Sequence, residues 1–319
     1  MKRSLTLAAL LLGVAVMGAI PSDASPATPA SKVVITSGPA FTTRSYSCTG
    51  PIPNRTRRGD VVRLVARLES YSAVLSGTAM TNLWIANPRV SVTTDGITRT
   101  FDFLASDPAT LFGLAYTRDS WRGILHDYPE SAMCIARLGS SFEPTVIVPV
   151  ATLGMHCCTL LNLIGADGGI SNSAVNIGNP AAVLVPAGKG AVLITGDNAF
   201  AYTFTDFARS AFPLRVLKMA SDESGLVNVT REWPHWIALD AAFWKSLFND
   251  VGHSPPYDDR GVLAAWAADE CELGRCSVAF HFLNHLNTRY LAFPAGRDSV
   301  SAYIRDLRAF LASHGYIRR

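Results

Sequence analysis

The stretch RVSVTTDGITRTFDF, residues 89–103, contains two runs in which apolar and polar residues alternate, separated by Asp95-Gly96. Alternation with a period of two is typical of a β-strand with one buried face. Asp-Gly favours the two-residue turn of a hairpin, because that turn needs a positive φ at both central residues. The stretch therefore predicts an antiparallel β-hairpin, and a β-sheet is the starting point for the fold.

A second alternating run, VVRLVARLES, occupies residues 61–70. Its apolar positions are Val62, Leu64, Ala66 and Leu68, and its charged positions are Arg63, Arg67 and Glu69. We therefore expect a strand with one buried and one solvent-exposed face.

Runs rich in Val, Ile and Leu follow at 145–153, 181–200 and 213–230, and Phe200, Tyr202 and Phe204 alternate as on one strand face. We predict an N-terminal β-rich region over 33–144 and a β-repeat-like region over 145–232. The β part is expected to be either propeller-like or a sandwich.

The pattern changes at Trp233-Pro234, after which apolar residues recur at helical spacing. Helices are expected over 237–250, 261–274, 277–293 and 299–316. They make residues 233–319 a C-terminal helical region. The predicted fold class is mainly β with a C-terminal α-helical bundle (α+β).

The N-terminus has the features of a secretory signal peptide. Lys2-Arg3 supplies positive charge, and residues 5–20 form an uncharged apolar stretch that is followed by small residues. That stretch is shorter than the ~20 residues that a transmembrane helix needs. We expect a signal peptide over 1–24, a linker over 25–32, and a secreted / extracytoplasmic protein with no membrane span after signal cleavage.

The composition predicts a globular chain with a sizeable core. Of 319 residues, 49% are hydrophobic and 17% are charged, and the formal net charge is +3. The densest basic cluster, NRTRRGD at 54–60, is typical of a solvated turn. A charge this small and dispersed argues against nucleic acid as a partner.

The chain has six cysteines: Cys48, Cys134, Cys157, Cys158, Cys271 and Cys276. In an exported protein an even number predicts disulfide bonds, and six cysteines allow 15 connectivities. Proximity favours Cys271–Cys276, and Cys48–Cys134 would then close the N-terminal half. Cys157 and Cys158 form either a vicinal bridge, which is the favoured pairing, or the ends of two separate bridges.

Three segments carry a resemblance to a known family. Gly154-Met155-His156-Cys157-Cys158-Thr159 follows a Val-rich strand, AFAYTFTDFARSAFPLRVL occupies 199–217, and VNVTREWPHWIALDAAFWKSLF occupies 227–248. In combination, residues 145–319 resemble exported bacterial FG-GAP/VCBS-repeat-like proteins. The resemblance implies a β-repeat architecture but no activity, because none is established for that family.

Members of that family carry Asp-x-Asp-Gly-Asp-Gly loops, whose oxygens are able to hold calcium. In this chain FEPTVIVP (142–149) and AGKGAVLI (187–194) occupy the corresponding places without those carboxylates. Calcium is thus the one cofactor that the resemblance suggests, and since the acidic loops are missing, no cofactor is predicted.

Four residues are candidates for a functional site. His156 adjoins two cysteines, but neighbouring side chains on a strand point to opposite faces, so a disulfide is favoured over a Cys–His dyad. Asp197 stands alone after a strand, and Trp233 and Trp236 lie where the helical region begins. If exposed, these aromatic side chains would form a recognition surface for sugar or peptide, and if buried, which is the favoured alternative, they would form the seam between sheet and helical bundle.

His281 and His285 share a helical face but lack the glutamate of the zinc-protease motif, so no metal ligand and no catalytic residue is predicted. The favoured function is a non-enzymatic binding or interaction protein at the cell envelope, with envelope polysaccharide or protein as partner. The alternative is a secreted hydrolase, which requires either two converging carboxylates or a free thiol beside a histidine.

Overall fold

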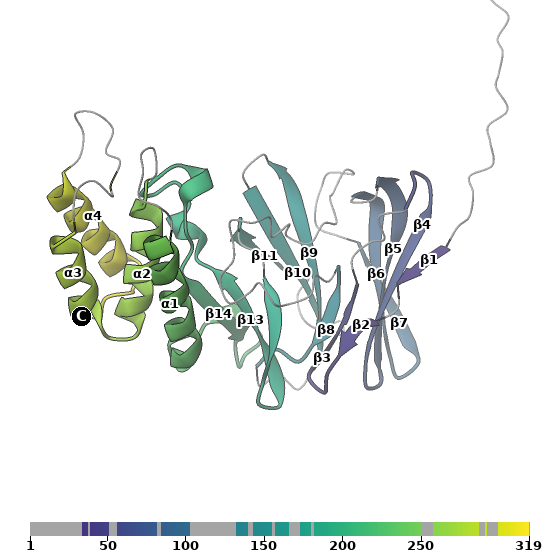
Figure 1. The fold of residues 1–319 in the computed structure, drawn as a ribbon. Helices are drawn as coiled ribbons and strands as arrows, with labels where there is room; N and C mark the ends of the chain where they lie inside the picture. Colours follow the sequence, from purple (N-terminus) through teal and green to yellow (C-terminus); the bar gives the residue numbers. More distant parts are fainter. Residues whose placement is uncertain are drawn as a thin grey trace, which may run out of the picture. The chain divides into compact units, whose positions relative to one another are not determined.

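The computed structural model describes residues 34–37, 39–50, 56–81, 84–102, 132–139, 143–154, 157–165, 173–179, 182–250, 258–286, 291 and 299–318. Residues 32–319 form one compact unit. Its described part contains fifteen β-strands and four α-helices (Figure 1). The predicted signal peptide, the linker and His156 lie outside the described residues.

The predicted hairpin at 89–103 is confirmed. Strand β6 (Trp84–Thr94) pairs antiparallel with β7 (Ile97–Asp102), and Thr94 lies opposite Ile97. Asp95 and Gly96 have φ values of 50° and 80°, the positive values that a tight two-residue hairpin turn requires.

The hairpin belongs to a five-stranded sheet in the order β1-β4-β5-β6-β7, which we call the first sheet. β1 (Val34–Ser37) runs parallel to β4 (Val61–Leu68), and β5 (Tyr71–Thr81) continues antiparallel. Along β4 the predicted apolar set is buried, and Arg63 and Arg67 are exposed. The alternation in 61–70 therefore identified the buried face correctly.

The second sheet has six strands in the order β11-β10-β9-β8-β3-β2. The bounds are β2 (Pro39–Thr42), β3 (Tyr46–Thr49), β8 (Cys134–Ala136), β9 (Thr145–Gly154), β10 (Cys157–Gly165) and β11 (Ser173–Gly178). Strands from both sides of residue 144 thus share one sheet. In β9, Val146 and Val148 belong to one buried cluster and Ile147 to another, so both faces of this strand are covered.

The first two sheets pack face to face. Val62 and Leu75 of the first sheet share a buried cluster with Ile135 and Val148 of the second. This is the packing of a β-sandwich. The described residues show no propeller and no closed barrel, so the propeller-like alternative has no support among them.

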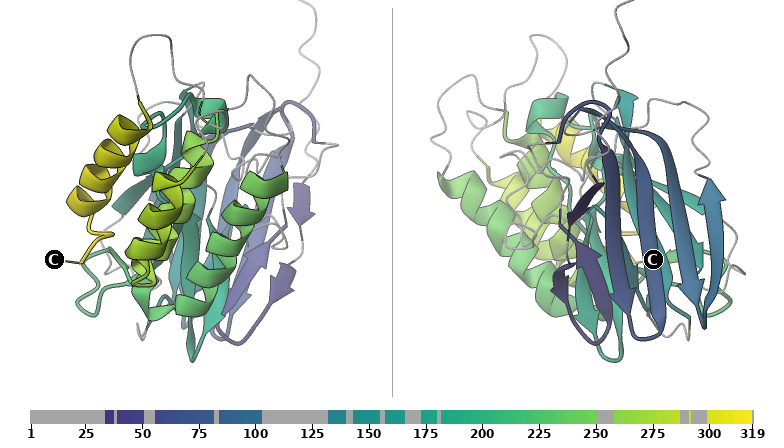
Figure 2. Two further views of the ribbon diagram at one scale, coloured as in Figure 1. Left: turned by 60° about the vertical axis from the view of Figure 1, so that its left-hand side comes forward. Right: turned by 90° about the vertical axis from the view of Figure 1, so that its right-hand side faces the viewer.

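The third sheet has the order β12-β13-β14-β15, with β12 (Val183–Ala187), β13 (Gly190–Gly196), β14 (Leu214–Met219) and β15 (Leu226–Asn228). Its inner face, with Leu193 and Leu217, packs against the second sheet. Its outer face, with Ile194 and Val216, packs against Ile237 of the first helix. The three sheets and the helices therefore form successive layers (Figure 2).

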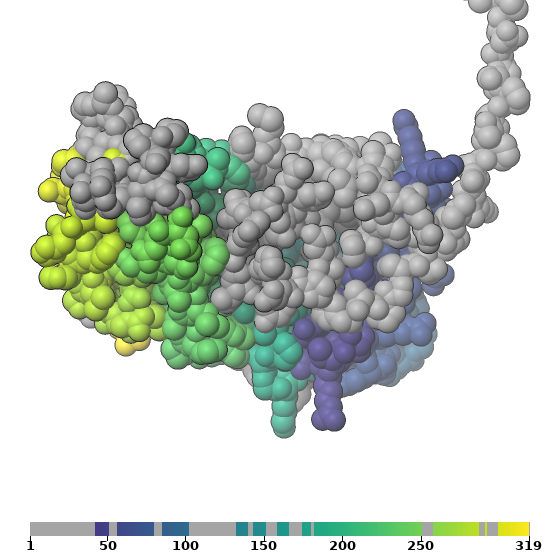
Figure 3. All heavy atoms as spheres, viewed as in Figure 1, coloured from purple at the N-terminus to yellow at the C-terminus, as the bar shows by residue number. Residues whose placement is uncertain are grey.

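The helical region consists of α1 (Pro234–Asp250), α2 (Arg260–Glu272), α3 (Cys276–Asn284) and α4 (Val300–Ser313). Figure 3 shows α1 and α2 in green beside α3 in yellow-green. All four predicted helices are present, and Gly315 has the positive φ of 80° expected after a helix end. The helix expected over 277–293 is shorter and ends at Asn284, because the chain tightens so that Leu286 N donates to Leu283 O.

The prediction of a strand from the alternation of Phe200, Tyr202 and Phe204 is wrong. The segment instead contains short 3-10 turns, η2 (Asn198–Phe200), η3 (Phe207–Arg209) and, further on, η4 (Thr230–Glu232). Asp197 caps η2 by accepting from Ala199 N, and Tyr202 has a φ of 59°. These turns bury Phe200 among the helices and leave Tyr202 54% exposed.

Two disulfide bonds join described cysteines, Cys48–Cys134 and Cys271–Cys276, and both match the favoured pairing. Cys158 is also disulfide-bonded, and its predicted partner Cys157 has a side chain outside the described part. Cys48 and Cys134 lie opposite each other on β3 and β8. Within the described residues, no helix has the length and apolar character that a membrane crossing requires.

Removing the Cys48–Cys134 bond should destabilise the protein more than removing Cys271–Cys276. The two bonds close sequence separations of 86 and 5 residues. Chain entropy then assigns about 4–5 kcal/mol to the long loop and about 2 kcal/mol to the short one. Urea unfolding of the two double alanine variants would measure this difference, and equal losses would contradict it.

Candidate functional site

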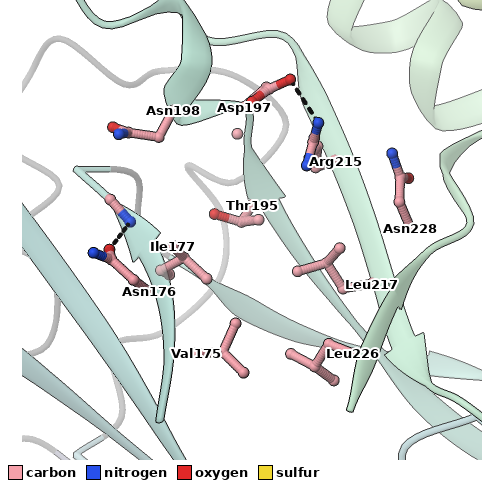
Figure 4. A pocket seen from close by; sticks show the side chains of 12 residues that line it. Val175, Asn176, Ile177, Thr195, Asp197, Asn198, Arg215, Leu217, Leu226 and Asn228 are labelled. Carbon is pink, nitrogen blue, oxygen red and sulfur yellow. Dashed lines mark hydrogen bonds and ion pairs between the residues drawn. The ribbon is translucent and has the colours of Figure 1, made fainter. Parts of the chain in front are cut away.

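A cavity of about 450 Å³ lies between β11 and the inner face of the third sheet (Figure 4). We call it the asparagine pocket, after Asn176, Asn198 and Asn228. Its other polar lining residues are Thr195, Asp197 and Arg215, and its apolar lining residues are Val175, Ile177, Leu217 and Leu226. Six of these lining residues are polar and four are apolar, so the wall is more polar than that of most ligand sites.

The three asparagines come from separate elements that the layered fold brings together. Asn176 lies on β11, Asn198 begins η2, and Asn228 ends β15. Asn198 packs against Gly178, where a Cβ atom would stand 2.0 Å from the Asn198 Cγ atom. Gly178 also has a φ of 74°, so this close approach depends on glycine.

Backbone donors fix the orientation of each amide. The Oδ1 atom of Asn176 accepts from Gly178 N at 2.8 Å, and that of Asn228 accepts from Thr230 N at 3.0 Å. The Oδ1 atom of Asn198 accepts from Asn179 N at 2.9 Å. A backbone N–H can only donate, so the oxygen, not the nitrogen, must face it.

The consequence is that the amide nitrogens of the three asparagines keep their N–H donors unused in the part of the chain that the structure describes. Among the described residues, the three Nδ2 groups have no hydrogen-bond acceptor. Each NH₂ group supplies two donors. The three amides at the rim of the asparagine pocket therefore offer donors, since two bonds each reach the oxygens of Asn198 and Asn228 and one reaches that of Asn176.

Asp197 and Arg215 form the charged wall of this pocket. The Asp197 carboxylate is buried and accepts from Arg215 Nη2 at 2.9 Å, from Tyr316 Oη at 2.7 Å and from Ala199 N at 3.0 Å. Burial, together with the Asp197 charge, raises the pKa of Tyr316 well above its usual value, so the phenol stays a donor. Arg215 is 32% exposed, and its buried Nε has no partner within the described part of the chain.

The structure places the sequence candidates in different locations. Asp197 lines the asparagine pocket, whereas Trp233 and Trp236 stack on each other with ring centroids 4.4 Å apart beyond the outer face of the third sheet. The rings of His281 and His285 are 4.4 Å apart and exposed. No group of three potential metal ligands and no free cysteine occurs among the described residues.

Sequence reasoning missed the asparagines and Arg215. A local signal existed, because Asn176 and Asn228 each hydrogen-bond the N–H two residues further on, which is the Asx-turn habit of asparagine. That signal identifies turns but says nothing about which turns meet in space.

Sequence reasoning also missed a pair of buried carboxyls, Asp240 of α1 and Asp269 of α2. Asp240 Oδ2 accepts from Leu214 N at 3.1 Å and from Trp244 Nε1 at 2.9 Å. Among the described residues no donor meets hydrogen-bond geometry at the Asp269 oxygens, although the nearby Leu214 N–H acts to lower the pKa of Asp269. One proton shared between the two carboxyls would satisfy them both.

The electrostatics of the two carboxyls agree with such a shared proton. Burial raises the pKa of Asp240 to about 6. Burial, and then the Asp240 charge, raise the pKa of Asp269 well above its usual value. Neither carboxyl lines the asparagine pocket, and the two residues are 4% and 0% exposed.

No protein-family model, curated protein or solved structure matches this chain.

The Asp240–Asp269 pair should make stability fall as pH rises. Both carboxyls have a higher pKa in the folded protein than in the unfolded chain, where it is near 4. Their contribution to the free energy of unfolding is therefore complete below pH 4 and is lost as the pH rises through the pKa values of the folded protein. Asp269→Asn cannot ionise, so relative to the natural chain it should gain roughly 1–3 kcal/mol between pH 4 and pH 8, at about 1.4 kcal/mol per pKa unit. Urea unfolding across this pH range would measure the gain.

Asp250→Asn, at an exposed position of α1, is the matched control and should show no such gain. A pH-independent difference between Asp269→Asn and the natural chain would contradict the shared proton.

Proposed function

We propose that this protein is a secreted, disulfide-braced binding protein of the cell envelope, and that the asparagine pocket holds a ligand group rich in oxygen acceptors. The observation that carries the proposal is the orientation of the three asparagine amides, each held by a backbone donor with its nitrogen left over. A carboxylate supplies about four lone-pair sites and no donor when ionised, which complements such a rim.

Arg215 favours a carboxylate over a neutral carbonyl group. Its guanidinium has five N–H donors, and Asp197 accepts from its Nη2 atom. Charge-assisted hydrogen bonds are about twice as strong as neutral ones, so a second carboxylate beside Arg215 would gain most. An acidic sugar of an envelope polysaccharide carries this group together with further acceptor oxygens.

The place of action is argued from the disulfides and from the N-terminus. Disulfide bonds persist in oxidising compartments and are rare in the cytosol. The signal-like sequence at 1–24 supports export. The kinship with exported FG-GAP/VCBS-repeat-like proteins stays a hypothesis that rests on the sequence segments alone.

Galacturonate should bind the natural protein more tightly than galactose, and Asn228→Asp should remove most of that affinity. An aspartate at this position keeps both hydrogen bonds from Thr230, because its oxygen accepts as the amide oxygen does. It replaces the donor at the rim with a negative charge. Since a hydrogen bond to a charged group contributes about 1.5–3 kcal/mol, titration calorimetry should show a loss of about tenfold or more.

Asn176→Asp should act in the same direction, because it keeps the bond from Gly178 N. Asn249→Asp adds the same charge at an exposed position of α1 and should bind galacturonate like the natural chain. Failure of galacturonate to bind, or equal affinity in Asn228→Asp, would refute a carboxylate site here.

A further inference from the structure

A second cavity, of about 720 Å³, lies beside the turn of the β12–β13 hairpin. Its charged lining residues and its aromatic one are Glu69, Arg137, Lys189, Lys218, Glu232 and Trp233, and we call it the tryptophan pocket. Successive side chains of a strand point to opposite faces. Leu217 of β14 therefore lines the asparagine pocket while Lys218 lines the tryptophan pocket.

The walls of the tryptophan pocket are held by backbone contacts. Ala191 N donates to Arg137 O at 2.7 Å, and Gly139 N donates to Ala191 O at 2.8 Å. A Cβ atom on Gly190 would lie 2.3 Å from Gly139 O, so the hairpin and the 137–139 segment approach as closely as glycine permits. A cavity framed in this way is present before any ligand binds, which lowers the entropic cost of binding.

Four of the five charged residues of the tryptophan pocket form two ion pairs, and the fifth, Lys189, is exposed. Arg137 Nη2 lies 2.6 Å from Glu69 Oε2, and Lys218 Nζ lies 3.1 Å from both carboxylate oxygens of Glu232. An ammonium group has three donors and a carboxylate has about four acceptor sites, so the Lys218–Glu232 pair retains both kinds of capacity. This wall offers donors and acceptors together, unlike the three amides of the asparagine pocket, which offer donors.

Trp233 supplies an apolar surface beside these pairs. Its ring stacks on Trp236 at an interplanar angle of 8°, which holds the indole in place. Its Nε1 atom is buried without a partner among the described residues. Indole N–H groups that are buried usually find an acceptor, so this one is an unsatisfied donor in a residue that lines the pocket.

We infer that the tryptophan pocket is a second binding site, which takes an uncharged hexopyranose unit of a polysaccharide. Each sugar hydroxyl both donates and accepts, matching the mixed wall, and the C–H face of the ring matches the indole. The two ion pairs cancel their own charges, and the fifth charge, Lys189, is exposed at the hairpin turn, so contacts with the paired wall and the indole need no charge on the ligand.

The experiment follows tryptophan fluorescence of the whole chain during titration with cellotetraose, N-acetylchitotetraose and mannotetraose. Tetragalacturonate and a single-stranded oligonucleotide are the charged comparisons. At least one neutral tetrasaccharide should bind and change the fluorescence. Binding by none of them, or by tetragalacturonate or the oligonucleotide alone, overturns the inference.

Glu232→Gln tests the location of that binding. The Glu232 side chain is 58% exposed, so the change should leave the fold intact, and it should weaken the neutral tetrasaccharide about tenfold. Asp306→Asn is the matched control, because the Asp306 side chain is also 58% exposed and pairs with Arg305 on α4, and its affinity should be unchanged. Equal affinities in the two variants overturn the inference.

Discussion

The third sheet has to be covered on both faces, and the rest of the structure depends on this constraint. Along β13 and β14, Leu193 and Leu217 face the second sheet, whereas Ile194 and Val216 face the helices. Neither apolar face is stable in water, so the sheet is stable only as an inner layer. Both cavities lie at the margins of this layer. Neighbouring side chains of β14 point to opposite faces of the sheet, so Leu217 lines one cavity and Lys218 lines the other.

The polar groups buried around this layer are satisfied by distant parts of the chain. Tyr316, from the C-terminal end, donates to the buried Asp197 carboxylate of the asparagine pocket. Asp240 of α1 accepts from Leu214 N of β14. An unpartnered buried polar group costs about 1–3 kcal/mol, so these contacts fix the position of the helices on the sheet.

The two cavities differ in the kind of hydrogen bond that they offer. The asparagine pocket presents donors because backbone N–H groups already occupy its amide oxygens. The tryptophan pocket keeps carboxylates and cations side by side around an aromatic ring. A polysaccharide with acidic and neutral units could engage both, and two linked weak contacts would raise the overall affinity without any new contact.

The sequence by itself determined those features that depend on neighbours along the chain. Period-two alternation located β4, Asp95-Gly96 located a turn, helical spacing located four helices, and proximity paired Cys271 with Cys276. The same local rule failed at Phe200, because capping by Asp197 and burial among the helices decided the conformation there. Only the tertiary structure decided which strands share a sheet, how the asparagine amides point, and that Asp240 meets Asp269. Periodicity shows that a face is buried, but the partner on that face comes from residues far away in the chain.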